Sequence, residues 1–499
     1  MLSAQAHSDG GAGTPLSRRV GEVVVIMFTA GTGGRAAKVV DRGLRRSCCP
    51  RSFVRRRPIR RPFVGSRGAA VGVAACMAVA VLPGCSSQWT ADQDEHASQS
   101  IAGSAAVHEH TGGAAAARAV DASDLRAKLE QLLGQHAILT VRLTRARLRG
   151  DGDLAQVADA ALGDNTADLG ELIGTVYGAE SAEKFEQMWF GHVTYLFNYA
   201  RGVADKDEAV KSQARRQLDS YTTDLSQFLE AATKKAAPAP VVAAGLRMHV
   251  DQLLQQVDAY AREDYDRAFA LERQSYAHMF PLGKTLAAGI LTGGGAGLPA
   301  DFDSPARQLR SRLGLLLGEH AELAVDAMRS GISNAPDFPA AGAALDANTR
   351  EITAMIESVF GAAGAGSFQT LWADHIDAFV TYTQAIVADD AALENAATER
   401  LKGFNAKFAT FLSTSTQGRL GAPALADAFV MHEDLLVRQI NAYAERDYST
   451  AYQLSFDAYQ HMFALAAQAA SAIGDTATAQ SPTGGPQTGE GGMAATKGW

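Results

Sequence analysis

Apolar residues recur every three or four positions along most of this 499-residue chain. In the first half they do so in six segments, at 124–149, 153–176, 181–203, 206–231, 240–262 and 265–289. This spacing puts the apolar side chains on one face of a helix. Short polar turns such as RGDGD and YGAE separate the segments. Because short connections make consecutive helices antiparallel neighbours, the pattern predicts an all-α protein built from helical bundles.

The same pattern occurs a second time in the chain. LLGQHAILTVRLTRA at 132–146 matches LLGEHAELAVDAMRS at 316–330. MHVDQLLQQVDAYAREDY at 248–265 matches MHEDLLVRQINAYAERDY at 431–448. The offset is 184 for the first pair and 183 for the second, which indicates an internal duplication with a single length change.

The duplication sets the expected domain organisation. We predict two homologous antiparallel helical-bundle repeats of about six helices each, repeat 1 at 121–290 and repeat 2 at 306–474. The Gly- and Pro-containing segment 291–305 is expected to link them. The low-complexity tail 475–499 is expected to be disordered.

The N-terminal part of the chain has the composition of an export signal. The basic segment RRRPIRRPFVGSR at 55–67 runs into the uncharged stretch GAAVGVAACMAVAVL at 68–82, which is the order of a signal peptide. That apolar stretch is shorter than the roughly twenty residues of a membrane span. The following sequence LPGC at 82–85 resembles a bacterial lipobox, although its proline departs from the usual small residue. The resemblance implies that Cys85 is the lipidated first residue of the mature protein.

These features predict how the chain is held at the cell surface. Residues 1–84 would be an N-terminal extension and signal peptide, and the polar segment 85–120 a disordered tether. The expected location is the extracytoplasmic face of the cell membrane, and the expected partner is that membrane, reached through the lipid on Cys85. No feature of the sequence identifies a protein partner.

Composition and charge narrow the function further. Residues 1–67 contain 14 Lys and Arg against 3 Asp and Glu, which leaves 32 and 51 for residues 68–499, a net charge of −19. An acidic body argues against a nucleic-acid partner. All four cysteines lie in the first 85 residues, so the body has no cysteine metal site. The chain contains no phosphate-binding loop, dinucleotide fingerprint, HExxH or GxSxG motif, which favours a binding protein over an enzyme and identifies no catalytic residue.

Four histidines recur at matching positions in both repeats. They are His136, His192, His249 and His278 in repeat 1, and His320, His375, His432 and His461 in repeat 2. Each interrupts an apolar stripe, so its side chain is expected to point inward. Residues equally far from an antiparallel turn lie at the same height, because both helices rise about 1.5 Å per residue. By this measure His136, His192 and Asn165 form one level cluster, and His249 and His278 form another. Asn348 takes the place of Asn165 in repeat 2.

Two interpretations of these histidines stay open. In a satisfied polar layer, the imidazoles would hydrogen-bond to asparagine, tyrosine or backbone groups and only fix helix packing. In a metal centre, some or all of the four histidines in each repeat would bind up to one ion, with the two asparagines as supporting residues. Ligation by imidazole alone suits Cu or Zn. Met248 and Met279, which adjoin His249 and His278, tilt the choice slightly towards copper.

Several blocks also resemble a group of known proteins. LLGEHAELA at 316–324, the W-x-x-H pattern at 372–375, MHEDLL at 431–436 and AYQHMF at 458–463 resemble uncharacterised tandem-repeat all-helical lipoproteins exported by Gram-positive bacteria. The resemblance spans about residues 124–470 and implies the fold and the location, but no activity or site. We therefore expect a lipid-anchored binding protein with a metal in each repeat. The alternative is a metal-free envelope protein with a structural or interaction role.

Overall fold

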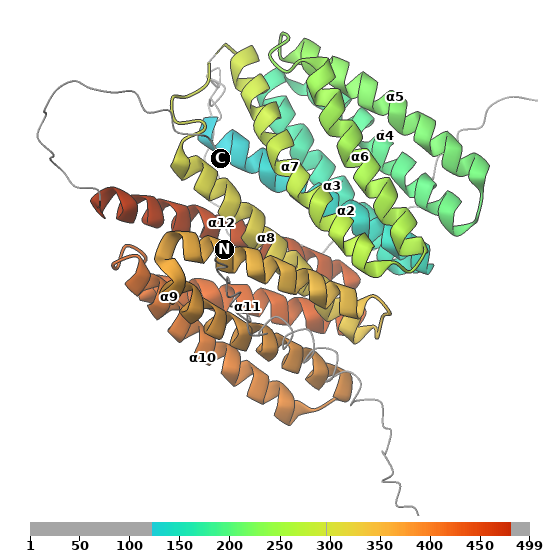
Figure 1. The fold of residues 1–499 in the computed structure, drawn as a ribbon. Helices are drawn as coiled ribbons and strands as arrows, with labels where there is room; N and C mark the ends of the chain where they lie inside the picture. Colours follow the sequence, from blue (N-terminus) through green and yellow to red (C-terminus); the bar gives the residue numbers. More distant parts are fainter. Residues whose placement is uncertain (1–121, 296, 481–499) are drawn as a thin grey trace, which may run out of the picture. The chain divides into compact units, whose positions relative to one another are not determined.

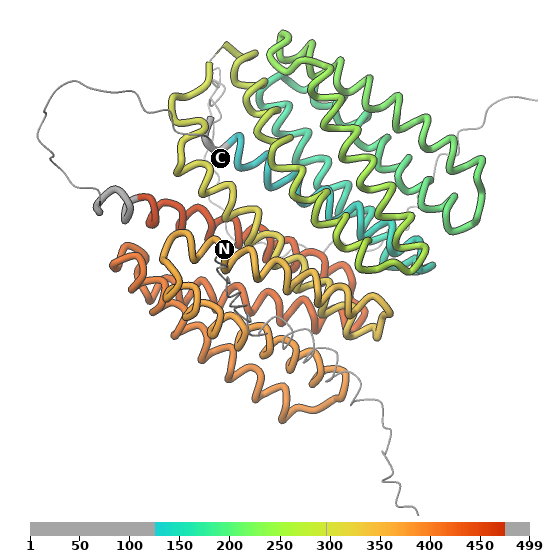
Figure 2. The backbone as a smooth tube through the Cα atoms, in the orientation of Figure 1, coloured from blue at the N-terminus to red at the C-terminus, as the bar shows by residue number. Residues whose placement is uncertain are grey.

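A computed structural model describes residues 122–295 and 297–480, and eleven α-helices make up almost all of this part of the chain (Figure 1). The described residues contain no β-strand. The prediction of an all-α fold is therefore confirmed. Between successive helices the backbone reverses direction through short turns (Figure 2).

Repeat 1 contains the six predicted helices. They are α2 (Ala122–Arg149), α3 (Gly152–Tyr177), α4 (Ala179–Ala204), α5 (Glu208–Ala232), α6 (Ala239–Ala261) and α7 (Tyr265–Gly293). Each helix packs on the next, and α2 also packs along α7, which brings the first and last helices of the repeat together. Aspartates begin several of the helices; Asp207, for example, accepts hydrogen bonds from the backbone of Ala209 and Val210. Such caps satisfy amides that have no partner within the helix.

Repeat 2 follows the same plan with five assigned helices. They are α8 (Pro305–Ile332), α9 (Phe338–Ala388), α10 (Ala391–Ser415), α11 (Ala422–Ala444) and α12 (Tyr448–Gln480). The 51-residue α9 is interrupted at Gly361, where φ is 72° and ψ is 177°. Gly178, the matching residue between α3 and α4, has φ 85° and ψ 167°. Glycine favours this positive φ, so α9 corresponds to two helices of repeat 1.

The predicted boundaries need two adjustments. α12 continues to Gln480 and so includes the first six residues of the segment 475–499 that was expected to be disordered. The connection between α7 and α8 comprises residues 294–304, slightly less than the predicted linker. The predicted signal peptide, Cys85 and tether lie outside the described residues. Among the described helices, none has the length and apolar composition of a membrane span.

The two repeats have largely separate apolar cores and also pack on each other. α7 contacts α8 and α9, α2 contacts α8, and α3 contacts α12. The rings of Tyr276 and Tyr459 lie 6.4 Å apart at this contact. A Cβ atom on Gly318 would lie 2.6 Å from the Tyr276 hydroxyl, and one on Gly134 would lie 2.7 Å from the Tyr459 hydroxyl. This close approach explains the glycine in both LLGQH and LLGEH.

Buried ion pairs also join the repeats. Nη2 of Arg142 on α2 lies 2.6 Å from a Glu322 carboxylate oxygen and 2.7 Å from an Asp326 carboxylate oxygen, both on α8. Arg145 pairs with Asp326 at 3.2 Å and with Glu272 of its own repeat. All these side chains are less than a tenth exposed. Arg142 and Asp326 occupy matching positions, so the duplicated helices carry opposite charges where they meet.

Candidate metal centres

The structure brings three histidines of each repeat together in the core. A ring nitrogen of each lies within 4.8 Å of a ring nitrogen of each other member. Triad 1 consists of His136 on α2, His192 on α4 and His249 on α6; triad 2 consists of His320 on α8, His375 on α9 and His432 on α11. The six side chains lie on the apolar faces of their helices, and none is more than 3% exposed. The prediction that these histidines point inward is confirmed.

Triad 1 contains one direct contact between imidazoles. Nε2 of His136 lies 3.0 Å from Nε2 of His192. One neutral ring therefore donates to the other, and the accepting ring carries its proton on Nδ1. Both Nδ1 atoms are buried without a hydrogen-bond partner. Nδ1 of His249 lies 3.4 Å from the Ser275 hydroxyl, whereas its Nε2 has no partner. These three atoms are the ring nitrogens of triad 1 that lie apart from its hydrogen bonds.

Aromatic rings enclose triad 1. The Trp189 ring centroid lies 4.8 Å from those of both His136 and His192. Tyr221 stacks on His192 at a centroid distance of 4.4 Å. These contacts hold two of the three imidazoles in place and exclude water from them.

Triad 2 is more symmetric and has fewer hydrogen bonds. Each pair of its ring centroids is 6.1 Å apart. Both ring nitrogens of His320 and both of His432 are buried without a partner in the described structure. Nδ1 of His375 faces Oε1 of Glu433 at 3.4 Å, and Asn405 donates to the other Glu433 carboxylate oxygen at 2.6 Å. His320 and His432 therefore lack the hydrogen bonds that buried polar atoms normally make, and one ring nitrogen of each lies within 4.8 Å of the ligand atoms of the other triad members.

Aromatic rings hold triad 2 as they hold triad 1. Phe404 stacks on His375 at 4.3 Å, in the position that Tyr221 occupies in repeat 1. Trp372, which matches Trp189, lies 4.6 Å from His320. The two triads therefore share their histidines and their aromatic walls, whereas Glu433 and Asn405 replace Val250 and Thr222 of repeat 1.

Burial keeps five of these imidazoles neutral by lowering their pKa. It lowers the pKa of His192 and of His320 to about 3. Burial, followed by the neighbouring histidines, also lowers the pKa of His136, His249 and His432 well below the ordinary value. Water no longer stabilises the charged ring, so protonation is unfavourable. At neutral pH these side chains are in the form that binds metal.

The fourth histidine of each repeat lies apart from the triad. Nε2 of His278 donates to the backbone oxygen of Gly245 at 2.9 Å, and Nε2 of His461 donates to that of Ala428 at 2.8 Å. His249 joins His136 and His192 in triad 1, whereas His278, predicted to be level with His249, reaches the backbone oxygen of Gly245 one turn before it on α6. Equal height along two antiparallel helices does not fix which way a side chain points around its helix axis.

The asparagines hold helices together one turn away from the triads. Asn165 donates to the Leu132 backbone oxygen at 3.0 Å and to the Gln135 side chain at 2.8 Å. Asn348 makes the matching bonds to Leu316 and Glu319 at 3.0 and 2.8 Å. Both therefore join the second helix of a repeat to its first. A supporting asparagine would accept the second ring N–H of a ligating histidine through Oδ1, but Oδ1 of Asn165 and of Asn348 has no hydrogen-bond partner.

The methionines next to these histidines point elsewhere. Met248 and Met431 are more than half exposed. Met279 and Met462 are buried among apolar core residues. Adjacent helical residues diverge by about 100°, so a methionine beside a triad histidine faces away from it. The positions of these methionines therefore give no support to the slight preference for copper that the sequence suggested.

Residues that the sequence analysis missed complete the surroundings of the triads. Glu433 directly follows His432, and an acidic residue next to a core histidine is a signal that could have been noticed. Ser275 lies on the same apolar stripe as His278, yet its hydroxyl faces His249. A side chain that faces the second nitrogen of a ligating histidine is a common feature of metal sites.

The geometry allows three nitrogen ligands to reach one ion. Zn–N distances of about 2.0–2.1 Å in a tetrahedral site place nitrogens roughly 3.4 Å apart. The 3.0 Å contact in triad 1 is already close to this separation, and since no pair is more than 4.8 Å apart, the remaining separations need to close by at most about 1.4 Å. Three imidazoles leave a fourth coordination position for another ligand.

Comparisons with known proteins assign no family. No protein-family model, curated protein or solved structure matches the chain. The fold and the site define a class in structural terms: an all-α protein with a buried group of three histidines in each of its two halves. Its function is inferred from these two groups.

Proposed function

We propose that the protein binds one transition-metal ion, Cu or Zn, at each histidine triad. The observation that carries the proposal is the convergence of three buried imidazoles in each repeat, with ring nitrogens that have no other partner. The part-buried fourth histidines differ, because His278 and His461 each bond to a backbone oxygen. Bound metal would give the triad nitrogens a partner of the kind that neutral imidazole prefers.

The surroundings suggest how individual rings would bind. His375 would use Nε2, because its Nδ1 faces the Glu433 carboxylate and can donate to it. A histidine held between metal and carboxylate is a common arrangement that fixes the ring and raises its basicity. His249 would likewise use Nε2, with its Nδ1 directed at Ser275. In the metal-free protein, Nε2 of His136 and Nε2 of His192 contact each other. Metal binding would replace this contact by bonds to the ion.

The metal-free alternative rests on one observation in triad 1. The hydrogen bond between His136 and His192, together with the Tyr221 stack, could fix helix packing without a ligand. Triad 2 offers no such bond between its rings. There, the alternative leaves His320 and His432 unsatisfied at a cost of about 1–3 kcal/mol for each buried group. The metal proposal explains both triads with a single role, so we favour it.

The N-terminal sequence supports a location for this binding. We place the protein at the extracytoplasmic face of the cell membrane, held by lipid on Cys85. The basic segment, the apolar stretch and the lipobox-like LPGC support this, in the order that export requires. The net negative charge of residues 68–499 argues against a nucleic-acid partner. The protein would then hold metal outside the cytoplasm.

Metal content tests the proposal. Untagged protein would be loaded with Zn or Cu(I), dialysed, and analysed for metal per chain. We expect two ions for the unmodified protein, one for His192→Leu or His375→Leu, and none for the double variant. His278→Leu and His461→Leu are matched controls outside the triads and should retain two ions. Equal metal content in the double variant and the unmodified protein would contradict the proposal.

A further inference from the structure

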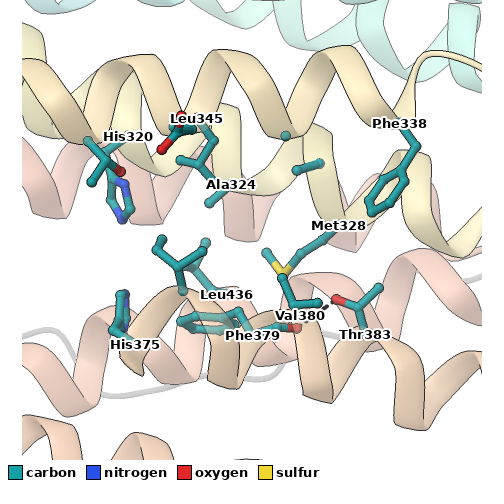
Figure 3. A pocket seen from close by; sticks show the side chains of 15 residues that line it. His320, Ala324, Met328, Phe338, Leu345, His375, Phe379, Val380, Thr383 and Leu436 are labelled. Atoms are coloured by element: carbon teal, nitrogen blue, oxygen red, sulfur yellow. Dashed lines mark hydrogen bonds between the residues drawn. The ribbon is translucent and has the colours of Figure 1, made fainter. Parts of the chain in front are cut away.

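A cavity lies directly beside triad 2. It has a volume of about 40 Å³ and lies between α8 and both parts of α9. His320 and His375 line one end, and Phe338 lies near the other (Figure 3). Figure 3 shows both imidazoles directed into the space between the helices. The side chains between the two ends, such as Met328 and Phe379, are mostly apolar.

A sequence difference between the repeats accounts for this cavity. Ala324 and Ala327 line it, whereas the matching residues of repeat 1 are Thr140 and Leu143. Leu143 is 2% exposed and packs in an apolar cluster, so its side chain takes up space that Ala327 leaves open. Larger side chains at other positions, such as Phe379 in place of Leu196, form walls of the cavity without filling it.

The cavity leads from the buried triad towards the surface. His320 is completely buried, whereas Gly342, Asp346 and Val380, which also line the cavity, are partly exposed. Asp346 forms an ion pair with Arg350, and the Thr383 hydroxyl donates to the Phe379 backbone oxygen. Two of the polar groups along the lining are thus already engaged with protein partners. A small molecule entering here would meet mainly apolar walls before it reached the imidazoles.

Size and polarity define the molecule that fits. One water molecule needs roughly 10–15 Å³ of such space, and cavities lined by apolar side chains disfavour water. A cavity of about 40 Å³ therefore has room for a molecule of two or three heavy atoms. An ion would lose its hydration without a compensating partner along the walls. An uncharged diatomic molecule meets both conditions.

We propose that the metal ion at triad 2 binds a small uncharged diatomic ligand through this cavity, whereas the ion at triad 1 does not. The inference rests on the proposed function, because it requires metal at both triads. Three imidazoles leave a coordination position free, and Ala324 and Ala327 line the cavity that reaches triad 2, where repeat 1 has the larger Thr140 and Leu143. The two triads would thus hold metal alike but differ in access to a further ligand.

Carbon monoxide is a suitable probe, because it binds Cu(I) without any redox change. The full chain would be loaded anaerobically with two Cu(I) per chain, and bound CO measured from its infrared stretch. We expect about one CO per two Cu(I). The variant Ala324→Thr/Ala327→Leu, which copies the lining of repeat 1, should keep both copper ions and lose at least about 90% of the CO. His192→Leu, which removes a ligand of triad 1, should keep one copper ion and the CO.

The outcomes separate the two proposals. If the protein binds neither copper nor zinc, both fail; if it binds zinc but no copper, only the cavity proposal fails. If it binds two copper ions but no CO, or two CO, or if the Ala324→Thr/Ala327→Leu variant binds CO undiminished, the cavity proposal fails while metal binding stands. Loss of copper together with CO in that variant would also overturn it, because these alanines would then support the metal site itself. Retention of copper with loss of CO is the result that supports the cavity as the access path.

Discussion

Replacing His320 by leucine should make the metal-free protein more stable. The imidazole is completely buried, and neither of its ring nitrogens has a hydrogen-bond partner. A buried polar group without a partner costs about 1–3 kcal/mol, and leucine fills a similar volume without that cost. We expect His320→Leu to raise the free energy of unfolding by about 1–3 kcal/mol at pH 7. The same change should remove the metal site of triad 2.

The gain should increase as the pH falls. Burial lowers the pKa of His320 in the folded protein to about 3, against 6.5 in the unfolded chain. Below pH 6.5 the unfolded state therefore takes up a proton that the folded state does not, which destabilises the unmodified protein. At pH 5 this effect amounts to about 2 kcal/mol. The variant lacks the titrating group, so its advantage should grow by that amount between pH 7 and pH 5.

Urea unfolding of metal-free protein, followed by circular dichroism at both pH values, measures these differences. His461→Leu is the matched control, because that imidazole donates to the Ala428 backbone oxygen. Losing this hydrogen bond should cost about 0.5–1.5 kcal/mol. If His320→Leu destabilised the protein by more than about 1 kcal/mol, without a pH-dependent change, His320 would have a structural partner and the reasoning would be refuted.

Two further predictions concern the interface and the anchor. Arg142→Met should lower the free energy of unfolding by about 3–5 kcal/mol, because it leaves the buried carboxylate of Glu322 unpaired; a loss below about 1 kcal/mol in urea unfolding would contradict the packing of the two repeats. Cys85→Ser should release the protein from the membrane fraction and abolish the added lipid mass; unchanged membrane partitioning and apparent mass would show that Cys85 is not lipidated.

Much of the fold could be predicted because its signals are local. Helical spacing of apolar residues identified all six segments of repeat 1, and polar turns separated them at nearly the observed boundaries. The break at Gly361 is also visible by its match to Gly178. The extension of α12 to Gln480 was missed, because low-complexity composition there suggested disorder.

The composition of the site was harder to predict because it depends on rotation and packing. All six triad histidines were identified as inward-facing, yet heights along the helices could not show that His249 joins His136 while His278 reaches the Gly245 oxygen. The pairing of Arg142 with Asp326 depends on how the repeats pack, which no local pattern records. The cavity likewise depends on Ala327, which matches Leu143 of repeat 1. Whether such a difference leaves a cavity depends on how the surrounding side chains pack.

X-ray absorption spectroscopy of the zinc-loaded protein, at two ions per chain, tests the central claim most directly. The spectrum reports the number and type of atoms bound to the metal. We expect three imidazole ligands per zinc at about 2.0–2.1 Å, with the scattering pattern of the outer ring atoms and one further light ligand. Fewer than two imidazoles per ion, or a sulfur ligand at about 2.3 Å, would contradict metal binding by the triads.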